Sequence, residues 1–527
     1  MWPDSFSGGL ICSIDGTMRM VHPGMPFAWA MLVVIFMGLV IAWSLISPRP
    51  QPRTPLALSL AVVPGSGPLV RALLASHWPR TLLRIVVAAL FLLAIAAGFL
   101  GTPIPERNLA TVLTWNVWWS LVIVSVFFVG SAWCSVCPWE TLGSFAVNLR
   151  LWGRAVPDPG LGLKVPRLLR SLWPAAVLFA GLTWLELGFG ITRDPRATAV
   201  LAVVMVALVI AALALFERKA FCRYMCPVGR TIGAYSQLAP VALRPVDPDL
   251  CLNCETLDCY HGSSTVEPCP TFLTMGRLQQ NTYCLSCTNC AQSCPKENVS
   301  WQLRPMGNEA RQSARPHLDE AGFTVVLLAL TTLHGVSMVP FWDNWITELA
   351  MAIGDGQMRL GAFTVGMATS LVVPAALFIF AVAATRWLMG SAVSYRRLFA
   401  LLAFAALPVA FTYHLAHNVG HVIGETQGFG EVLANPFGSA SLPLSATDKH
   451  LRMLLMLDWY PMIFTLQAGL MALGFWLAIQ VLRHRGASLD DSGKAPGGLG
   501  LSPMLGFVGT TSGFNLWLLT QDMVMRL

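Results

Sequence analysis

Charged residues are scarce in this chain of 527 residues: Asp, Glu, Lys and Arg make up only 12% of it, whereas 55% is hydrophobic. A soluble globular protein usually carries about 25% charged residues, so a single soluble core cannot hide this much apolar sequence. The excess of positive charge is small, +7, and the basic residues fall in short loops beside apolar runs. This distribution argues against a nucleic-acid partner and predicts a protein that contacts membrane lipid.

Cysteine is almost missing outside one part of the chain, since 12 of the 13 cysteines lie between Cys134 and Cys294. Such clustering argues against the disulfide framework of a secreted protein. A positively charged segment before the first apolar run is also missing, so we expect that run to remain as a helix and not to be cleaved as a signal.

Nine apolar runs are long enough to span a bilayer. They lie near 26–47, 82–101, 110–132, 172–191, 198–217, 322–341, 361–385, 398–423 and 460–482. Arginine and lysine dominate the loops after the first, third, fifth, seventh and ninth runs. The positive-inside rule then places the N-terminus outside and the C-terminus in the cytoplasm of a bacterial inner membrane.

Four parts are expected along the chain. Residues 1–230 form an N-terminal membrane domain of about five helices, and 231–320 form a ferredoxin-like insert on the cytoplasmic side. Residues 321–485 form a C-terminal membrane domain of four helices, and 486–527 are a flexible linker with an apolar tail. This tail could lie on the membrane surface, re-enter the membrane or dock on the insert. The predicted fold class is a polytopic α-helical membrane protein with a small α+β insert.

The strongest motif is Cys284-Leu-Ser-Cys287-Thr-Asn-Cys290-Ala-Gln-Ser-Cys294-Pro295. It has the C-x-x-C-x-x-C-x-x-x-C-P spacing of bacterial ferredoxins, in which the fourth cysteine binds the other of two 4Fe–4S clusters. A stretched partner half precedes it. The cross-over rule predicts one cluster at Cys251, Cys254, Cys259 and Cys294, and a second at Cys269, Cys284, Cys287 and Cys290. Structural zinc is the alternative, because paired C-x-x-C motifs also bind zinc.

Two further motifs follow the third and fifth apolar runs: Cys134-Ser-Val-Cys137-Pro, and Cys222-Arg-Tyr-Met-Cys226-Pro. We expect both at the cytoplasmic surface and close together. Their four thiols could hold a third cluster or a metal such as copper, or form a redox-active dithiol pair. The alternative is that the Cys-Pro turns only end helices and pack locally.

These motifs together resemble those of the membrane polyferredoxins, the proteins that serve nitrous oxide reductase, periplasmic nitrate reductase and cytochrome oxidase assembly. The resemblance covers residues 80–300. It implies transfer of electrons between the quinone pool or cytoplasmic donors and a periplasmic partner, or help in assembling copper sites.

Histidines mark the C-terminal membrane domain, which the resemblance does not cover. His414, His417 and His421 fall on one stripe of a helix, and His334 lies at a similar depth in another. They could bind a b-type haem, or copper or another metal, or form a polar seam or proton path beside a quinol site. His22 and the other loop histidines are expected to be solvated.

The predicted function is therefore membrane electron transfer through 4Fe–4S clusters. The donor would be a quinol or a cytoplasmic reductant, and the acceptor an outer-side redox protein, complex subunit or metal. The alternative is a factor that reduces or handles copper or iron during oxidoreductase assembly. The sequence leaves open whether the chain is itself part of a quinol- or metal-linked oxidoreductase.

Overall fold

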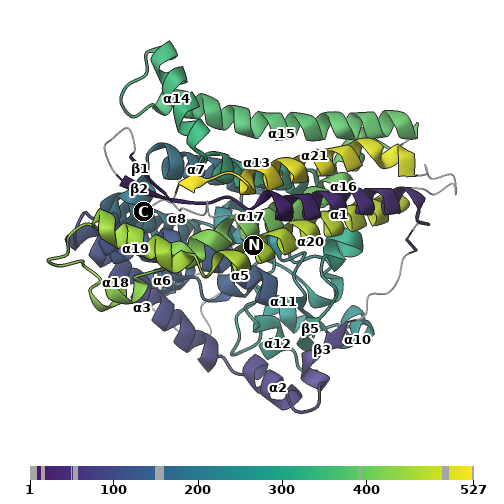
Figure 1. The fold of residues 1–527 in the computed structure, drawn as a ribbon. Coiled ribbons are helices and arrows are strands. Elements are labelled where there is room, and N and C mark those ends of the chain that lie inside the picture. The colour runs from purple at the N-terminus through teal and green to yellow at the C-terminus, as the bar shows by residue number, and fades with distance from the viewer. Residues whose placement is uncertain are drawn as a thin grey trace.

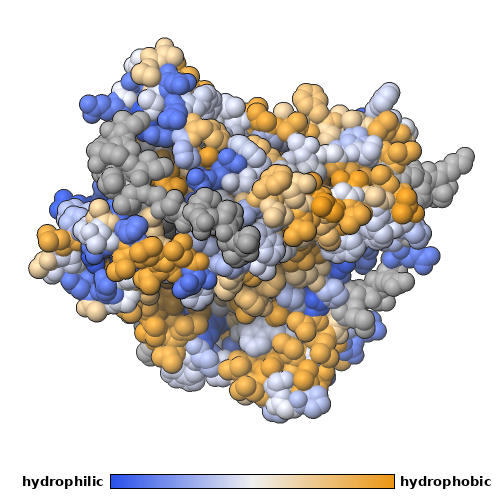
Figure 2. Space-filling model, viewed as in Figure 1, coloured by the Kyte–Doolittle hydropathy of each residue, from blue (hydrophilic) through white to orange (hydrophobic). Residues whose placement is uncertain are grey.

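The computed structural model describes residues 9–12, 18–48, 50–51, 57–148, 160–390, 393–489 and 498–524. Most of these residues are helical, and each of the nine apolar runs lies in helix. The long helices α1, α15, α20 and α21 run side by side (Figure 1). Many of their large apolar side chains are exposed, as the space-filling view shows (Figure 2). Long apolar helices with such exposed faces indicate a membrane protein.

Within the described residues, seven helical stretches are long and apolar enough to cross a membrane. They are α1 (Phe27–Ile46), α3 (Trp78–Leu100), α4 to α6 (Leu109–Asn148), α8 (Pro195–Leu215), α15 (Leu360–Met389), α16 to α17 (Tyr395–Glu425) and α20 (Tyr460–Ala487). The predicted number of nine is not confirmed. One run forms the shorter α7 with η6, Trp173–Gly188, and another bends by 95° between α13 and α14. This bend lies directly before Pro340, because proline can begin a helix but cannot continue one.

Further helices, some of them segments of the composite stretches above, make up the rest of the membrane domain. They are α4 (Leu109–Thr111), η3 (Val112–Trp118), α5 (Trp119–Val129), η4 (Gly130–Ser135), α6 (Pro138–Asn148), α7 (Trp173–Thr183), η6 (Trp184–Gly188), α13 (Leu318–Val336), α14 (Pro340–Ile353), α16 (Tyr395–Leu402), α17 (Ala406–Glu425), α18 (Phe429–Ala434) and α19 (Ala446–Met456). Connecting turns are η2 (Pro105–Arg107), η5 (Arg167–Leu169), η7 (Ile191–Arg193), η11 (Ala403–Ala405) and η12 (Gly498–Leu501). The stretches η3 and η6 are π-helical, a geometry that is frequent at functional sites.

The apolar tail forms α21 (Ser502–Leu519), which packs inside the bundle against α1, α15 and α20. It runs antiparallel to α1, since the Met25 amide donates to the Leu519 carbonyl at 2.7 Å. Beyond it, β6 (Met523–Val524) pairs with β2 (Met18–His22), which also pairs with β1 (Gly9–Cys12). Both described chain ends thus lie at one end of the bundle, so the predicted placement of the two termini on opposite sides is wrong. Polar residues such as Asn515, which accepts a hydrogen bond from Thr332 at 3.0 Å, lower the hydropathy of α21, which is not among the seven candidate spans.

We call the end of the bundle at which β2 lies the far end, and the opposite end of α1 the insert end. The insert is a small α+β unit at the insert end. Its elements are η8 (Phe221–Met225), α9 (Pro227–Tyr235), β4 (Val241–Pro245), α10 (Pro248–Leu252), α11 (Asp258–His261), η9 (Met275–Arg277), α12 (Asn289–Ser293), β5 (Val299–Leu303) and η10 (Glu309–Ser313). An antiparallel sheet has the order β3–β5–β4. Its edge strand β3 (Leu58–Ser59), η1 (Leu60–Val62) and α2 (Gly67–Ala75) come from the N-terminal region, so residues 58–75 complete the insert.

A buried ion cluster fastens the insert internally and to the bundle. Glu309 forms ion pairs with Arg244 and Arg304 and accepts a hydrogen bond from the Asn281 amide at 2.7 Å. From α20, Arg485 donates to the carbonyl oxygens of Glu309 and of the next residue at 2.9 and 2.8 Å. Because a buried charge is costly without a partner, these contacts fix the insert against α20.

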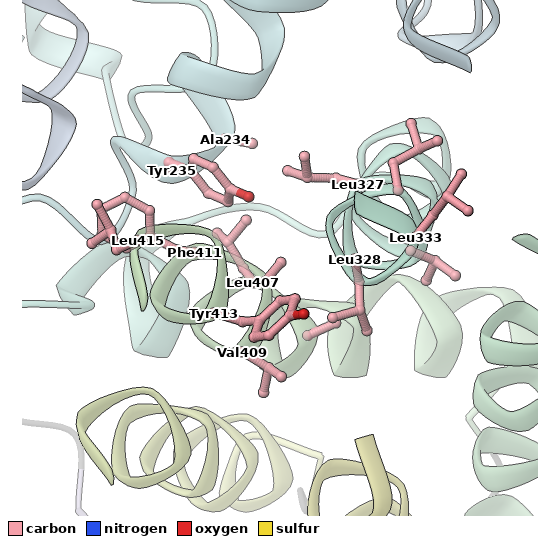
Figure 3. Close-up of a cluster of buried hydrophobic side chains, with 14 of the residues drawn as sticks. Ala234, Tyr235, Leu327, Leu328, Leu333, Leu407, Val409, Phe411, Tyr413 and Leu415 are labelled. Carbon is pink, nitrogen blue, oxygen red and sulfur yellow. The ribbon is translucent and has the colours of Figure 1, made fainter. Parts of the chain in front are cut away.

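The core of the bundle is centred on α13 and α17, whose apolar side chains meet in Figure 3. From the insert, α9 adds Tyr235, which is fully buried and packs against Phe411 of α17 with ring centroids 4.8 Å apart. On the other side of α17, Gly474 of α20 lets the two backbones approach, since a Cβ there would collide with Thr412. Helix α17 is therefore enclosed by neighbours and shielded from lipid.

Candidate electron-transfer site

Twelve cysteines fall into three sets of four, which we number 1 to 3. Set 1 is Cys251, Cys254, Cys259 and Cys294; set 2 is Cys269, Cys284, Cys287 and Cys290; set 3 is Cys134, Cys137, Cys222 and Cys226. All twelve are free thiols. Cys12 belongs to none of the sets.

Several thiols that the cross-over rule assigns to the same cluster are electrostatic neighbours in the structure. Cys251 has Cys254 and Cys294 among its closest charged neighbours, so set 1 draws its fourth thiol from the second half of the motif. Cys290 interacts electrostatically with Cys287, Cys284 and Cys269. The two sets adjoin, because Cys259 of set 1 also interacts with Cys269 and Cys290 of set 2.

Backbone geometry explains how such closely spaced cysteines face one centre. Ser286 and Thr288, on either side of Cys287, both adopt positive φ, 49° and 62°. This sparsely populated conformation turns the chain sharply at each step. As a result the Ser286 amide donates to the Cys284 sulfur at 3.4 Å, and in the same way the Leu273 amide donates to Cys269 at 3.2 Å. Hydrogen bonds to the sulfur atoms are among the features that tune iron–sulfur clusters.

Set 3 is assembled from two segments far apart in the sequence. Cys134 lies in η4 after the kink at Gly130, and Cys222 lies in the π-helical η8. Cys137 has Cys226, Cys222 and Cys134 as electrostatic neighbours, so all four thiols share one site. At its edge Cys226 caps α9, accepting a hydrogen bond from the Gly229 amide at 3.2 Å.

Set 3 adjoins set 2. Cys134 interacts electrostatically with Cys284, and Cys134 and Cys287 line the same cleft, which has a volume of about 530 Å³. The cleft lies between α3, α6 and the insert, and its basic residues include Arg80 and Lys219. Both bases stabilise negative charge on Cys287. The three sets therefore form a continuous series from the insert to the membrane helices.

One buried arginine points to an anionic group at set 3. Arg230 is fully buried, and its guanidinium donates to the Thr282 carbonyl at 2.5 Å. Within the described part of the chain, its Nε and second Nη have no hydrogen-bond partner. It favours the charged form of both Cys134 and Cys226. A buried guanidinium left partly unsatisfied is costly, so its position fits a site built to hold negative charge.

The donor chemistry fits 4Fe–4S clusters better than zinc. Among the described residues, no three His, Cys, Asp or Glu side chains are close enough together to hold a single metal ion. A tetrahedral zinc site needs sulfur atoms about 3.8 Å apart, since the Zn–S distance is about 2.3 Å. A cubane needs a wider spacing, because each thiolate binds a different iron atom. Burial raises the pKa of Cys284 to about 11 and raises that of Cys290 as well, so these thiols need a bound cation to become thiolates.

Beyond set 3, polar groups continue along α17. The Tyr235 hydroxyl lies 3.2 Å from His414 Nδ1. Further along the helix, the rings of His417 and His421 are 4.9 Å apart, and that of His22 lies 5.3 Å from His421. The expectation that His22 is solvated is wrong, because the pairing of β2 with β6 lays it on α17. Burial, and to a lesser extent His421, lowers the pKa of His22 to about 4, so its ring is neutral at pH 7.

The four histidines predicted as one haem or metal site lie on two neighbouring helices, His334 on α13 and the other three on α17. His334 lies against Glu186 of η6, with 3.7 Å between Nε2 and the carboxylate, while the α17 histidines pack on one another. His421 also contacts Glu425 at 3.2 Å. The rings of His417 and His421 are tilted by 59° to each other, and the ring of His22 meets that of His421 edge-on. Buried polar groups thus line this part of α17, as is usual for ionisable residues that face the interior of a membrane bundle.

Comparison with known proteins bears on set 3. Residues 111–154 and 198–237, which include its four cysteines, match the family described as 4Fe-4S binding domain. Over 83 residues the chain is 33% identical to a putative electron transport protein of Escherichia coli (strain K12), covering 15% of this chain and 21% of that protein. These matches support an iron–sulfur electron-transfer family. The chain thus spans about a fifth of the Escherichia coli relative's length.

A second relative of this iron–sulfur protein is an uncharacterized protein of Methanocaldococcus jannaschii. The two are 24% identical over 220 residues, which is 41% of this chain and 81% of the archaeal protein. No solved structure matches. Because the cluster-binding family covers the Cys-Pro motifs, it favours a cluster at set 3 over copper or a dithiol pair.

Sequence reasoning missed three residues of this site. Arg230 and Tyr235 lie four and nine residues after Cys226, on the helix that the Cys-Pro turn starts. Arg230 is the single charged residue in the sequence Val228–Leu238, which was a usable signal because charged residues are rarely buried without a partner. For His22 no signal existed, since only strand pairing places it.

Proposed function

We propose that this protein carries electrons through three 4Fe–4S clusters, held by sets 1, 2 and 3, from the cytoplasmic side of a bacterial inner membrane into the membrane domain. The supporting observation is the series of adjoining thiol sets, in which Cys259 links set 1 to set 2 and Cys134 links set 2 to set 3. Each cluster, when bound, supplies one-electron transfer. The protein's own residues fix the order of the sets and neutralise their charge.

The electrons pass between a quinol or cytoplasmic donor and a redox partner or metal on the outer side. Tyr235 supports a path from set 3 into the membrane domain, because it lies on the helix that starts at Cys226 and its hydroxyl contacts His414 on α17. From there His417 and His421 lead toward the far end over about 10 Å of helix rise. We assign these side chains to proton movement that accompanies electron transfer. The Glu186–His334 pair offers a second buried acid–base pair for the same task.

Metal and sulfide analysis tests the proposal directly. Protein purified without oxygen should contain about 12 iron atoms per chain, four for each set, with matching acid-labile sulfide. The double variant C222S/C226S should lose about four of them and one low-temperature EPR signal. C12S is the matched control, since Cys12 lies outside the sets, and it should keep all of them. Zinc in place of iron and sulfide, or unchanged iron in C222S/C226S, would refute the assignment.

The alternative is a factor that reduces or handles copper or iron. Bound copper in stoichiometric amount, lost on replacing His417 and His421, would favour this alternative over electron transfer to a protein partner.

A further inference from the structure

Set 1 is the most open of the three sets. None of its cysteines is buried, whereas Cys284 and Cys290 of set 2 and Cys226 of set 3 are. An electron that crosses between this protein and a partner in water must pass where a centre comes near the surface. Set 1 is therefore the set at which we expect electrons to pass between this protein and a soluble partner.

The surface around set 1 is acidic. Asp247 caps the N-terminus of α10, Asp249 lies on it, and Glu255 and Asp258 follow it. We call these four residues, together with exposed Leu250 and Leu252, the docking face. Asp247 and Asp258 are electrostatic neighbours of set 1 thiols. Arg277 lies on η9, which packs against α10, and Lys296 and Glu297 closely follow Cys294 in the sequence, so this part of the insert also carries two bases and one further acid. Negative charge thus prevails here in a chain whose net charge is +7.

The apolar residues of the face need an explanation too. Leu250 and Leu252 are 42% and 62% exposed although they lie on a soluble insert, at the helix that carries Cys251. A small apolar patch ringed by charges is typical of a transient protein interface, where charge steers the encounter and apolar contact completes it.

The charge decides among the occupants. The cytoplasmic surface of a membrane is anionic and attracts basic segments, so the docking face would be repelled by lipid. A second copy would place the same acidic face against itself across a twofold axis. A partner with a basic rim remains.

We propose that the docking face binds a soluble electron-transfer protein that presents a basic rim around its cofactor. This inference rests on the proposed function, since it names the partner at set 1. One electron passes between the two centres, one being oxidised and the other reduced, and no bond forms or breaks. Complementary charge raises the association rate by 10- to 1,000-fold in such encounters.

The test uses the full-length protein, reduced with dithionite and freed of excess reductant, with oxidised cytochrome c as a basic probe and flavodoxin as an acidic one. Stopped-flow mixing measures the second-order rate constant. In low salt, cytochrome c should react at least tenfold faster than flavodoxin after correction for driving force. Its rate should fall steeply toward 1 M salt, where charges are screened beyond about 3 Å.

The decisive variant is D249N/E255Q, because both carboxylates are exposed and neither side chain forms a hydrogen bond with another described residue. It should slow cytochrome c severalfold in low salt and not at 1 M salt. The control E348Q/D458N removes the same charge from exposed sites away from the insert and should leave the rate unchanged. Charge reversal in D249K/E255K should speed flavodoxin. Equal rates for D249N/E255Q and E348Q/D458N would overturn the docking face while reducible clusters still upheld the proposed function.

Discussion

Replacing Glu309 with glutamine should loosen the insert, because this carboxylate pairs with two arginines in a buried site. The side chain is 1% exposed and lies between Arg304, 5% exposed, and Arg244, 13% exposed. E309Q keeps the shape and an acceptor for the Asn281 amide, but it leaves both guanidinium groups without a counter-charge. Removing one partner of a buried ion pair costs about 3–5 kcal/mol. We expect about 3 kcal/mol for E309Q and about 5 kcal/mol for E309A, which also removes the acceptor.

Set 2 should report this loss first. The Asn281 carbonyl accepts a hydrogen bond from the Cys284 amide at 2.8 Å, so Glu309 holds the segment that enters the ferredoxin motif. Denaturant unfolding of detergent-solubilised protein, followed by cluster absorbance, measures the insert separately from the helicity of the bundle. The control is E431Q, because Glu431 pairs with Arg107 while 68% exposed, and such a pair contributes at most about 1 kcal/mol. Equal midpoints for E309Q and E431Q would refute the reasoning.

Three further variants and one topology test follow. Gly474→Ala should destabilise the bundle by roughly 2 kcal/mol or more, the cost of an overpacked core. The control, Gly469→Ala, lies on the same helix with open space around it and should not destabilise the bundle. Thermal unfolding compares the two variants. Arg230→Met should lower the midpoint potential of the set 3 cluster in an EPR titration, and an unchanged potential would show that the cation does not face it. Tyr235→Phe removes the contact with His414, so it should slow re-oxidation by an outer acceptor without loss of iron. Reporter tags at the two chain ends should read the same side of the membrane; opposite sides would contradict the pairing of β2 with β6.

Most of what could be predicted came from short-range patterns in the sequence, namely its apolar runs and the spacing of its cysteines. The apolar runs had to become helices, because a backbone in lipid must satisfy its own hydrogen bonds. The ferredoxin spacing predicted the exchange of Cys294 between the two halves, since thiols so near in sequence can reach only certain centres. Neither inference needed the rest of the fold.

The failures arose where distant segments meet. Helix α21 contains Asn515 and several hydroxyl residues, so its hydropathy did not mark it as part of the bundle. Only the folded protein brings Thr332 of α13 to donate a hydrogen bond to the Asn515 side-chain oxygen. That one helix brings the end of the chain back to its beginning. The strand pairing that follows then buries His22 against His421.

The sequence by itself determined that the chain is a helical membrane protein with ferredoxin-type thiols, because hydropathy and ligand spacing are local properties. Only the tertiary structure decided that set 3 adjoins set 2, that Arg230 faces it, and that His22 packs against His421. These facts depend on which helices pack together. Packing depends on the sum of many weak contacts across the whole bundle, so it cannot be predicted from any one segment of the sequence.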